Sequence, residues 1–282
     1  MTKIAIITDS TAYLPDEYIQ QYGIIVAPQI LIWGDQTFQD GVDILPDEFY
    51  QRLQKATVMP TTSQVTIPAF QKLYKQLLDE GCDILAILIS EKLSGTIDSA
   101  VQALTSFPNA RIEIVDSHTT SMAMGFQILA AARAAQDGAS LAECKALAEK
   151  ARQHTGVIFA VDTLEFLHRG GRIGGGSRFL GTALNIKPIL EVTGGRVEAV
   201  ERVRTRTKSL NRVVDMIVER VGEQKPVRLA ALHANAAQEA QMILDHASQW
   251  LAPIETIMSQ VSPVVGTHAG PGTVGIAFMA GM

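Results

Sequence analysis

Cysteines, aromatic residues and long apolar runs are all scarce in this chain of 282 residues. The two cysteines, Cys82 and Cys144, stand far apart and in no metal-ligand spacing, so we expect two free thiols in a reducing compartment and no metal site. Aromatic residues make up only 6% of the chain, which argues against base-stacking surfaces. The net charge of −5 gives no general attraction to nucleic acid, so we expect no nucleic-acid partner.

Targeting and membrane-spanning segments are also absent from the sequence. The first apolar run, residues 4–7, is too short for a signal peptide. The longest candidate for a membrane span, residues 122–135, is broken by Gln127 and Arg133 and falls short of the roughly 20 apolar residues required. With 47% hydrophobic and 19% charged residues, the chain has enough apolar content for a sizeable core. We therefore expect a cytoplasmic protein without membrane insertion, in which any lipid ligand is carried inside the fold.

The first half of the chain alternates short apolar runs with helical periodicity. The runs at 3–10, 23–34, 83–90 and 111–117 predict strands, the second of them one or two strands. Helical spacing covers residues 67–80, 121–136 and 140–153, and a further helix starts at Thr96. This alternation predicts right-handed crossovers and a parallel sheet.

The second half has a different pattern. Strands are predicted at 156–162, 227–235, 253–265 and 274–279, and helices at 164–172, 205–221 and 239–251. We place the boundary near residue 155, which gives an α/β domain over residues 1–155 and an α+β domain over residues 156–282.

Polar clusters come directly after several predicted strands, at residues 8–11, 61–64, 90–96 and 116–117. The carboxyl ends of parallel strands form the ligand crevice of such sheets, so these clusters are candidates for binding. A structural alternative is helix capping, by Ser94 before Thr96 and by Thr62 or Ser63 before Pro68. The two interpretations are compatible, because helix N-termini also attract anions.

Two glycine-rich segments stand out in the second half. In residues 266–272, His268 lies among three glycines and a proline, which suggests either an ordinary turn or a constrained loop with a binding role. The segment at residues 169–176 lacks the spacing of a phosphate-binding loop and comes after a helical pattern, so we expect no nucleotide site there.

A local basic patch stands out in this acidic chain. Arg172 lies upstream of a denser group made up of Arg202, Arg204, Arg206 and Lys208. The patch is either a solvated face or a docking surface for an acidic partner.

An enzyme is the main alternative to a binding protein. Ser94 and His268 are the natural pair for a serine hydrolase, but no GxSxG elbow surrounds Ser94 and no third member can be named.

Taken together and in order, eight segments of the chain resemble the DegV family. They are IITDSTAYLP at the start, TTSQ at 61–64, SEKLSGTIDSA at 90–100, IVDS at 114–117, VDTLEFLHRGGRI at 161–173, KPIL at 187–190, VRTRTK at 203–208 and GTHAGPGTVG at 266–275. The resemblance implies a two-lobed fatty-acid-binding protein, not itself an enzyme, with its ligand between and within the lobes. It also implies that the chain is the binding subunit of a bacterial fatty acid kinase that supplies phospholipid synthesis.

By matching motif, the resemblance assigns site residues as well. Thr62, Ser94 and His268 fall where the family holds the fatty-acid carboxylate. Residues near the head group are Ser63, Gly95, Thr96, Thr267 and Arg172. Arg204 matches an arginine linked to kinase docking, with Arg202 and Arg206 close by. No catalytic residue, metal or cofactor is implied, and the one departure is Val65, where the family often has proline.

The chemistry of these residue types agrees with the assignment. A buried carboxylate needs hydrogen-bond donors, which two hydroxyls and an imidazole supply. None of the three is a permanent cation, so we expect the head group to be held without a fixed ion pair. About fourteen buried methylenes at ~0.8 kcal/mol each give roughly 10 kcal/mol before entropy costs, so the chain supplies the affinity. We expect the tail in the second half, at residues 157–161, 179–184 and 186–190. The alternatives that remain are an acyl hydrolase and a lipid-responsive regulator.

Overall fold

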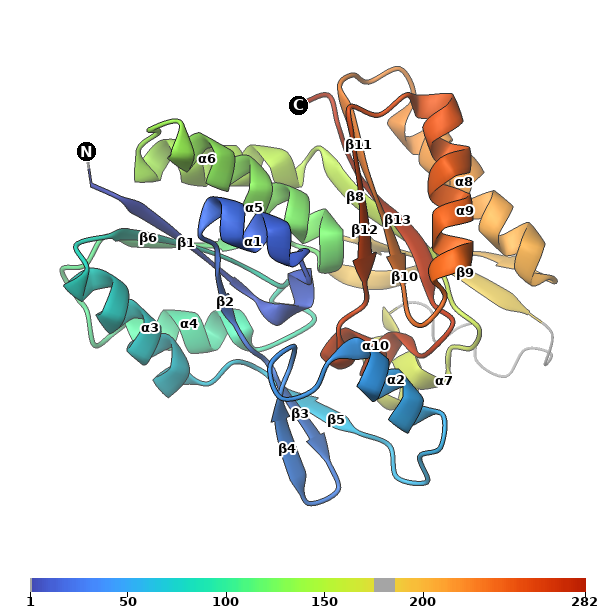
Figure 1. The fold of residues 1–282 in the computed structure, drawn as a ribbon, viewed down its shortest axis with the longest axis horizontal. Coiled ribbons are helices and arrows are strands. Elements are labelled where there is room, and N and C mark those ends of the chain that lie inside the picture. Colours follow the sequence, from blue (N-terminus) through green and yellow to red (C-terminus); the bar gives the residue numbers. More distant parts are fainter. Residues whose placement is uncertain (1, 175–185) are drawn as a thin grey trace.

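The computed structural model describes residues 2–174 and 186–282, and each half of the chain is built on its own sheet (Figure 1). The first sheet has the order β2-β1-β6-β7 and is parallel throughout. Its strands are β1 (Ile4–Asp9), β2 (Ile25–Ala27), β6 (Asp83–Leu88) and β7 (Ile112–Asp116). Every residue of β6 is buried, as expected for a parallel strand covered on both faces. The predicted parallel sheet is confirmed.

Helices cover both faces of this sheet. Helices α3 (Ile67–Asp79) and α4 (Thr96–Leu104) contact one face, and α5 (Ser121–Gln136) and α6 (Leu141–Arg152) contact the other. Side chains of β6 alternate accordingly, because Ile84 packs in the core with α3 and α4 whereas Leu85 packs in the core with α5 and α6. These helices match the predicted ranges within one or two residues.

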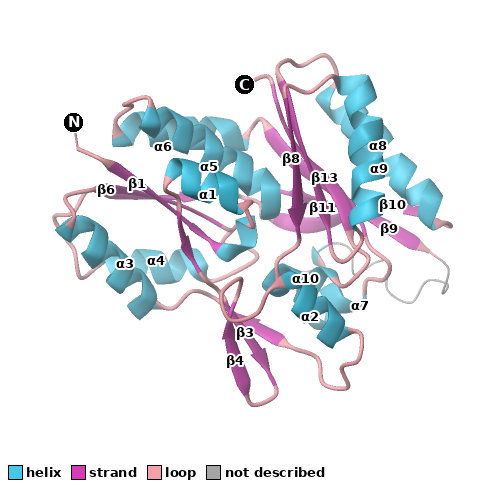
Figure 2. Cartoon of the chain, in the orientation of Figure 1, coloured by secondary structure: helices cyan, strands magenta, loops and turns pink. Residues whose placement is uncertain are grey.

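The second sheet is mixed, with the order β10-β9-β8-β13-β11-β12. Only β11 and β12 pair in parallel, and all other neighbours are antiparallel. The strands are β8 (Thr155–Ala160), β9 (Lys187–Thr193), β10 (Arg196–Val203), β11 (Val227–His233), β12 (Glu255–Gln260) and β13 (Val274–Ala280). Helices α8 (Arg206–Val221) and α9 (Ala237–Leu251) pack on the outer face, as Figure 2 shows. The α+β prediction is confirmed, although the sequence analysis did not assign the β9–β10 hairpin.

Helix α5 lies between the two sheets and contacts strands of both (Figure 1). Its residues 121–132 are all buried, which is the pattern of a helix surrounded by protein rather than of an amphipathic surface helix. The interruptions noted in its apolar run have internal partners: Gln127 Nε2 donates to the Ser117 carbonyl oxygen at 3.1 Å, and Arg133 pairs with Glu255 at 2.5 Å. The halves therefore share a core, and a domain boundary near residue 155, where β8 begins, stays a prediction.

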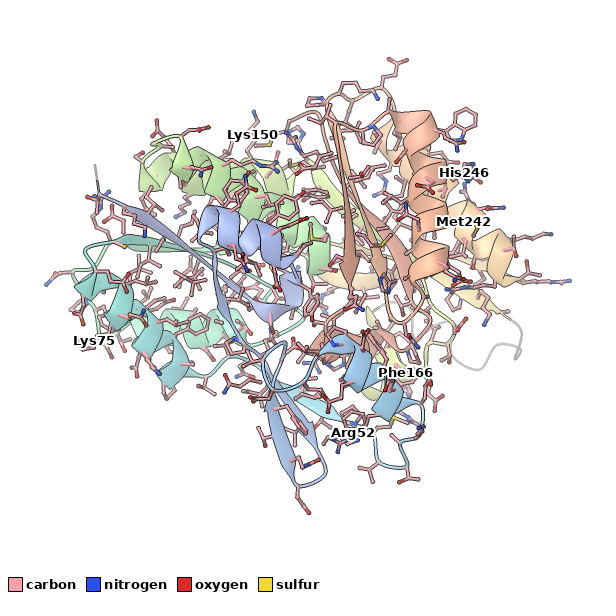
Figure 3. The ribbon with its side chains drawn as sticks, viewed as in Figure 1. Arg52, Lys75, Lys150, Phe166, Met242 and His246 are labelled. Atoms are coloured by element: carbon pink, nitrogen blue, oxygen red, sulfur yellow. The ribbon has the colours of Figure 1, made fainter. Side chains whose placement is uncertain are left out.

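A third, three-stranded sheet of order β4-β3-β5 lies beside the two large ones. It contains β3 (Ile30–Trp33), β4 (Gln36–Gln39) and β5 (Thr61–Ser63). Helix α2 (Pro46–Leu53) packs next to it, and Arg52 of this helix lies 4.3 Å from the ring centroid of Trp33 (Figure 3). Residues 23–34, predicted as one or two strands, are thus two strands in different sheets.

The end of the chain returns to this small sheet as helix α10 (Pro263–Ala269), which contacts α2, β3 and β5. The predicted strand over 253–265 is therefore wrong after Gln260. Ser262 caps the helix through Val265 N, and Pro263 occupies the first helical position. The remaining elements are the short helices η1 (Ser10–Ala12), α1 (Asp16–Tyr22) and α7 (Glu165–Arg169). Within the described residues, no helix is both long and apolar enough to cross a membrane.

Candidate functional site

A cavity of about 930 Å³, counting solvent at its mouth, lies between the two halves of the molecule. The first half contributes mainly residues of strand β5 and residues that come after strand ends, which are Thr11, Gln29, Thr62, Ser63, Gln64, Ile89, Leu93, Ser94, Thr120 and Ser121. The second half contributes mainly apolar residues, which are Val157, Phe159, Leu167, Val192, Val197, Leu232, Val261, Val264, Val265 and Ala269, together with Arg172, His268 and Thr273.

The structure brings the three predicted carboxylate-binding residues into the wall of this one cavity. Thr62 Oγ1 lies 2.8 Å from His268 Nε2, although the two residues are 206 positions apart in the chain. Ser94 Oγ lies 2.9 Å from the hydroxyl of Thr96. This region, with Ser63 and Arg172 beside it, is the polar end of the cavity.

The other residues predicted near the head group lie behind this surface. Gly95 is the N-cap of α4, and Thr96 is fully buried. Thr267 Oγ1 donates to the Pro263 carbonyl oxygen at 2.9 Å and borders a separate outer cleft that also reaches Arg172. These residues support the wall from outside the cavity.

The capping interpretation of Thr62, Ser63 and Ser94 is wrong. Helix α3 is capped by Thr66, whose Oγ1 accepts from Ala69 N, and the N-cap of α4 is Gly95, which has no side chain to make a capping bond. Thr62 instead pairs with Leu31 in the small sheet. Because these hydroxyls are not used at helix starts, they are available to a ligand.

His268 is positioned by helix α10, and a buried carboxyl of the first half anchors that helix. Asp40 accepts hydrogen bonds from Val264 N at 3.2 Å and from Ser10 Oγ at 2.6 Å. Burial raises the pKa of Asp40 to about 7, while these hydrogen bonds act in the opposite direction. The Tyr50 hydroxyl donates to the Val261 carbonyl oxygen just before the helix. His268 thus lies in a helix rather than in the constrained loop proposed from the glycines.

The imidazole of His268 is neutral at physiological pH. Burial, and secondarily the charge of Arg172, lower its pKa to about 4. Its Nδ1 atom is buried and has no hydrogen-bond partner among the residues the structure describes. Gly170 lies against this nitrogen so closely that a Cβ atom there would overlap the ring. The histidine is held in one place, with one ring nitrogen unused.

Arg172 places a permanent positive charge in the cavity wall. Its Nε donates to the Leu93 carbonyl oxygen at 3.1 Å and its Nη1 to the Gly170 carbonyl oxygen at 2.6 Å. Within residues 2–174 and 186–282, no carboxylate lies within ion-pair distance of this guanidinium. Burial lowers the pKa of Arg172 but leaves it charged. Arg172 thus lies where the sequence analysis expected it, near the head-group residues, and a head group held without a fixed ion pair stays a prediction.

The arginines predicted for docking differ in their surroundings. Arg206 is tied into the fold: it lies 2.5 Å from Glu239 and 3.7 Å from Asp162, and its Nη2 donates to the Gly272 carbonyl oxygen at 2.6 Å. Arg202 and Arg204 are exposed. Arg204 pairs with no carboxylate in the described part of the chain.

Several cavity residues were missed by the sequence analysis, among them Gln29, Thr120 and Ser121. The signal for the last two was present, because they come after β7 in the same way that the predicted clusters come after their strands. Asp9, which belongs to a predicted cluster, is used internally, since its carboxylate accepts from Thr11 Oγ1 at 2.6 Å and from Ile89 N at 2.7 Å. Asp116 and Ser117 do not line the cavity.

The predicted tail segments contribute unevenly to the cavity. Residues 157–161 supply Val157 and Phe159, whereas the predicted segment 186–190 does not reach the described wall. The same hairpin reaches it further along, through Val192 and Val197. The predicted segment 179–184 lies outside the described residues. No group of three or more histidine, cysteine or acidic residues suited to a metal ion occurs in the described ranges.

This arrangement agrees with what the chain is similar to. The profile of the DegV family, described as uncharacterised proteins, matches residues 3–281. The chain belongs to the DegV family. A DegV domain-containing protein from Streptomyces coelicolor is 37% identical over 97% of both chains, and the protein DegV from Bacillus subtilis is 34% identical over 98% of both.

Solved DegV structures share the whole fold. A DegV family protein from Thermus thermophilus, described by its fatty acid binding, has a TM-score of 0.94 and 34% identity, covering 99% of this chain and 100% of that one. The structure of DegV from Bacillus subtilis, described as a fatty acid binding protein, has a TM-score of 0.90 and 32% identity, with coverage of 99% and 100%. The two-lobed α/β architecture is thus that of the family.

Proposed function

We propose that this DegV protein binds one long-chain fatty acid and presents its carboxylate to a separate fatty acid kinase, which converts it to an acyl phosphate. The carboxylate binds at Thr62, Ser94 and His268, and the chain lies along the apolar wall. The observation that carries this proposal is the cavity itself, which joins a cluster of hydrogen-bond donors from both halves to an apolar sheet face of the second half. The descriptions of the Thermus and Bacillus structures support it.

The polar end has the chemistry that a carboxylate needs. When Thr62 accepts from His268 Nε2–H, its own hydroxyl hydrogen is available for a carboxylate oxygen. Ser94 supplies a second hydroxyl, and Arg172 supplies a charge that no carboxylate of the described chain neutralises. A buried carboxylate is thereby both hydrogen-bonded and balanced in charge.

The apolar wall supplies most of the affinity. Each buried methylene contributes about 0.8 kcal/mol, whereas a head-group hydrogen bond contributes about 1 kcal/mol net. Orientation is therefore set by the polar end, and affinity by the wall formed from β8, β9, β10 and β11.

Docking of a kinase beside the polar end is supported by the position of Arg204. The residue is exposed and precedes helix α8. The first residue of that helix, Arg206, is hydrogen-bonded to Gly272, in the turn that comes after His268. Arg204 is therefore two residues from a side chain that contacts the turn after His268, and this position is the basis for assigning the docking of an acidic partner to it. In this scheme the kinase supplies ATP and catalysis, and this chain has no catalytic residue of its own.

A hydrolase is less well supported by the geometry. His268 Nε2 is bonded to Thr62 rather than to Ser94, and no carboxylate orients its other nitrogen within the described residues. A pKa of about 4 also makes this imidazole a weak base at neutral pH. Ester hydrolysis that is lost in Ser94→Ala would nevertheless favour this alternative over the carrier.

Native mass spectrometry of the freshly purified protein tests the carrier function. We expect a noncovalent mass increment of one C14–C18 fatty acid that disappears when the same sample is denatured. A protein that is free of ligand, and that gains no mass with oleate or palmitate, would contradict the proposal.

The kinase step has its own test. We expect Arg204→Glu to retain fatty acid but to lower acyl-phosphate formation by an added fatty acid kinase and ATP, with Arg196→Glu on the same hairpin as the matched control. Full turnover with Arg204→Glu would remove the docking role. Ligand-dependent binding to another protein would point instead to a lipid-responsive regulator.

A further inference from the structure

The cavity wall carries a second group of hydroxyls, separate from the carboxylate-binding residues. Thr120 and Ser121 line the same cavity as Thr62 and His268 but belong to the start of helix α5, after strand β7. Neither belongs to the group of residues proposed to bind the carboxylate.

One of the two hydroxyls is buried without a partner. Thr120 Oγ1 is buried and has no hydrogen bond to any described residue. Ser121, which lies beside it in the cavity wall, is only 6% exposed. A polar atom removed from water without a partner is costly, so natural proteins rarely leave one unless a water or ligand completes it.

The usual use of such residues does not apply here. A threonine at an N-cap normally accepts a hydrogen bond from the first turn of its helix, yet Thr120 makes no such bond. The first-turn N–H groups of α5 also have no acceptor within the helix, and they add a partial positive charge to this end. Hydroxyl and N–H donors therefore gather at a point on the cavity wall where the residues that the structure describes supply no acceptor to Thr120 Oγ1.

The turn before α5 is held firmly in place. Ser90 N donates to the Thr119 carbonyl oxygen at 3.0 Å, and Thr119 N donates to Ser117 Oγ at 3.3 Å. Ser121 has a φ of 56°, in the left-handed region that side chains other than glycine seldom adopt. This backbone holds the two residues in the cavity wall.

We propose that Thr120 and Ser121 form a second polar subsite that binds an oxygen atom on the acyl chain, so that the cavity accepts hydroxy or oxo fatty acids. This inference rests on the proposed fatty-acid function. A hydroxyl or carbonyl oxygen accepts from the Thr120 hydroxyl without needing a counterion. A carboxylate binds instead at the polar end, because Arg172 is the one cation among the described residues of the cavity wall.

The test uses a positional series of hydroxystearic acids, with stearic acid as the reference. Dissociation constants are measured by displacement of a fluorescent fatty acid. We expect one position of the hydroxyl to bind within about threefold of stearic acid, although a purely apolar wall would reject every position. In Thr120→Val, the ratio of the hydroxystearate to the stearate dissociation constant rises about fivefold to tenfold, as expected for a lost hydrogen bond.

Thr119→Val is the matched control. The Thr119 hydroxyl is also buried and without a partner in the described chain, but it borders a neighbouring cleft rather than this cavity. We expect Thr119→Val to leave the ratio of the hydroxystearate to the stearate dissociation constant at the wild-type value. Thermal unfolding of both variants shows whether the fold is retained, which we expect because valine has the shape of threonine and no partner is lost.

Two results would overturn the subsite. One is that every hydroxystearate binds more than about thirtyfold more weakly than stearate, as an apolar wall that rejects the hydroxyl would require. The other is that Thr120→Val leaves the ratio at the wild-type value. Failure of stearate itself to bind is a different result, since it contradicts the fatty-acid function and removes the subsite with it.

Discussion

The two walls of the cavity are built in opposite ways. In the first half, the wall is assembled mainly from the short strand β5 and from separate turns that come after β1, β6 and β7, and each of these contributes one or two polar side chains. In the second half, neighbouring strands of one sheet supply apolar side chains from one face, such as Val157, Val192 and Leu232. The loop-built wall can place individual donors, whereas the sheet face offers a continuous apolar surface.

This difference teaches where specificity and affinity reside. A change in the loop-built wall alters one hydrogen bond, worth about 1 kcal/mol, while a change in the sheet face alters contact with a chain worth roughly 10 kcal/mol. We therefore expect a single mutation in the sheet face to lower fatty-acid affinity more than a single mutation in the loop-built wall.

The largest effect is expected from a charge in the apolar wall. Val192→Asp places a carboxylate against the acyl chain without a partner, and we expect fatty-acid affinity to fall at least about a hundredfold. Titration calorimetry with oleate measures this change in affinity. Val200→Asp, at an exposed position of the adjoining strand, is the matched control. Oleate affinity close to that of the wild type in Val192→Asp would show that this face is not the tail wall.

The next-largest effect is expected from protonation of His268 at the polar end of the cavity. His268 has a folded-state pKa of about 4, below the unfolded value of about 6.5, so protonation favours unfolding. Its contribution, about 3 kcal/mol, is present above pH 6.5 and is lost as the pH falls towards 4. We expect the free energy of unfolding of the wild type to fall more steeply over this window than that of His268→Gln.

Urea unfolding at several pH values measures this difference. His246→Gln, on the outer helix α9 (Figure 3), is the matched control. Parallel curves for the wild type and His268→Gln would mean that the imidazole is not held neutral by the fold.

A steric change probes how tightly the histidine is positioned. In Gly170→Ala the new Cβ overlaps the His268 ring, so we expect a loss of about 1–3 kcal/mol in stability together with weaker fatty-acid binding. Gly95→Ala is the control, because its Cβ meets only the movable end of the Gln64 side chain. Equal unfolding midpoints for the two variants would argue against close packing of the ring.

The smallest effect is expected from the hydroxyls of the loop-built wall. Thr62→Val combined with Ser94→Ala removes two donors, and we expect about tenfold weaker retention of palmitate with an intact fold. Hexadecanol lacks the carboxylate, so its binding depends mainly on the apolar wall. We expect the double mutation to change the affinity for hexadecanol much less than the affinity for palmitate. Unchanged lipid occupancy in the double variant would remove the head-group assignment.

Much of this molecule is determined by the sequence alone. Apolar runs and helical spacing located most of the large elements, and the rule that parallel strands end at a ligand crevice pointed to Ser94, which comes after β6. Thr62 was named by the same rule, although it lies inside the antiparallel strand β5. These features are local, because they depend on the side-chain period and on the polar residues directly after each strand.

Only the tertiary structure decided how these residues are used. Whether Thr62 and Ser94 cap helices or face a cavity depended on the pairing of β5 with β3 and on Thr66 as the cap of α3. Residues after Gln260 form helix α10 because they pack against the small sheet of the first half, far away in sequence. Arg206 is bound internally, while Arg172 is left without a carboxylate among the described residues. These outcomes depend on contacts between residues that are far apart in the chain. Local sequence patterns do not indicate which of those residues will be in contact.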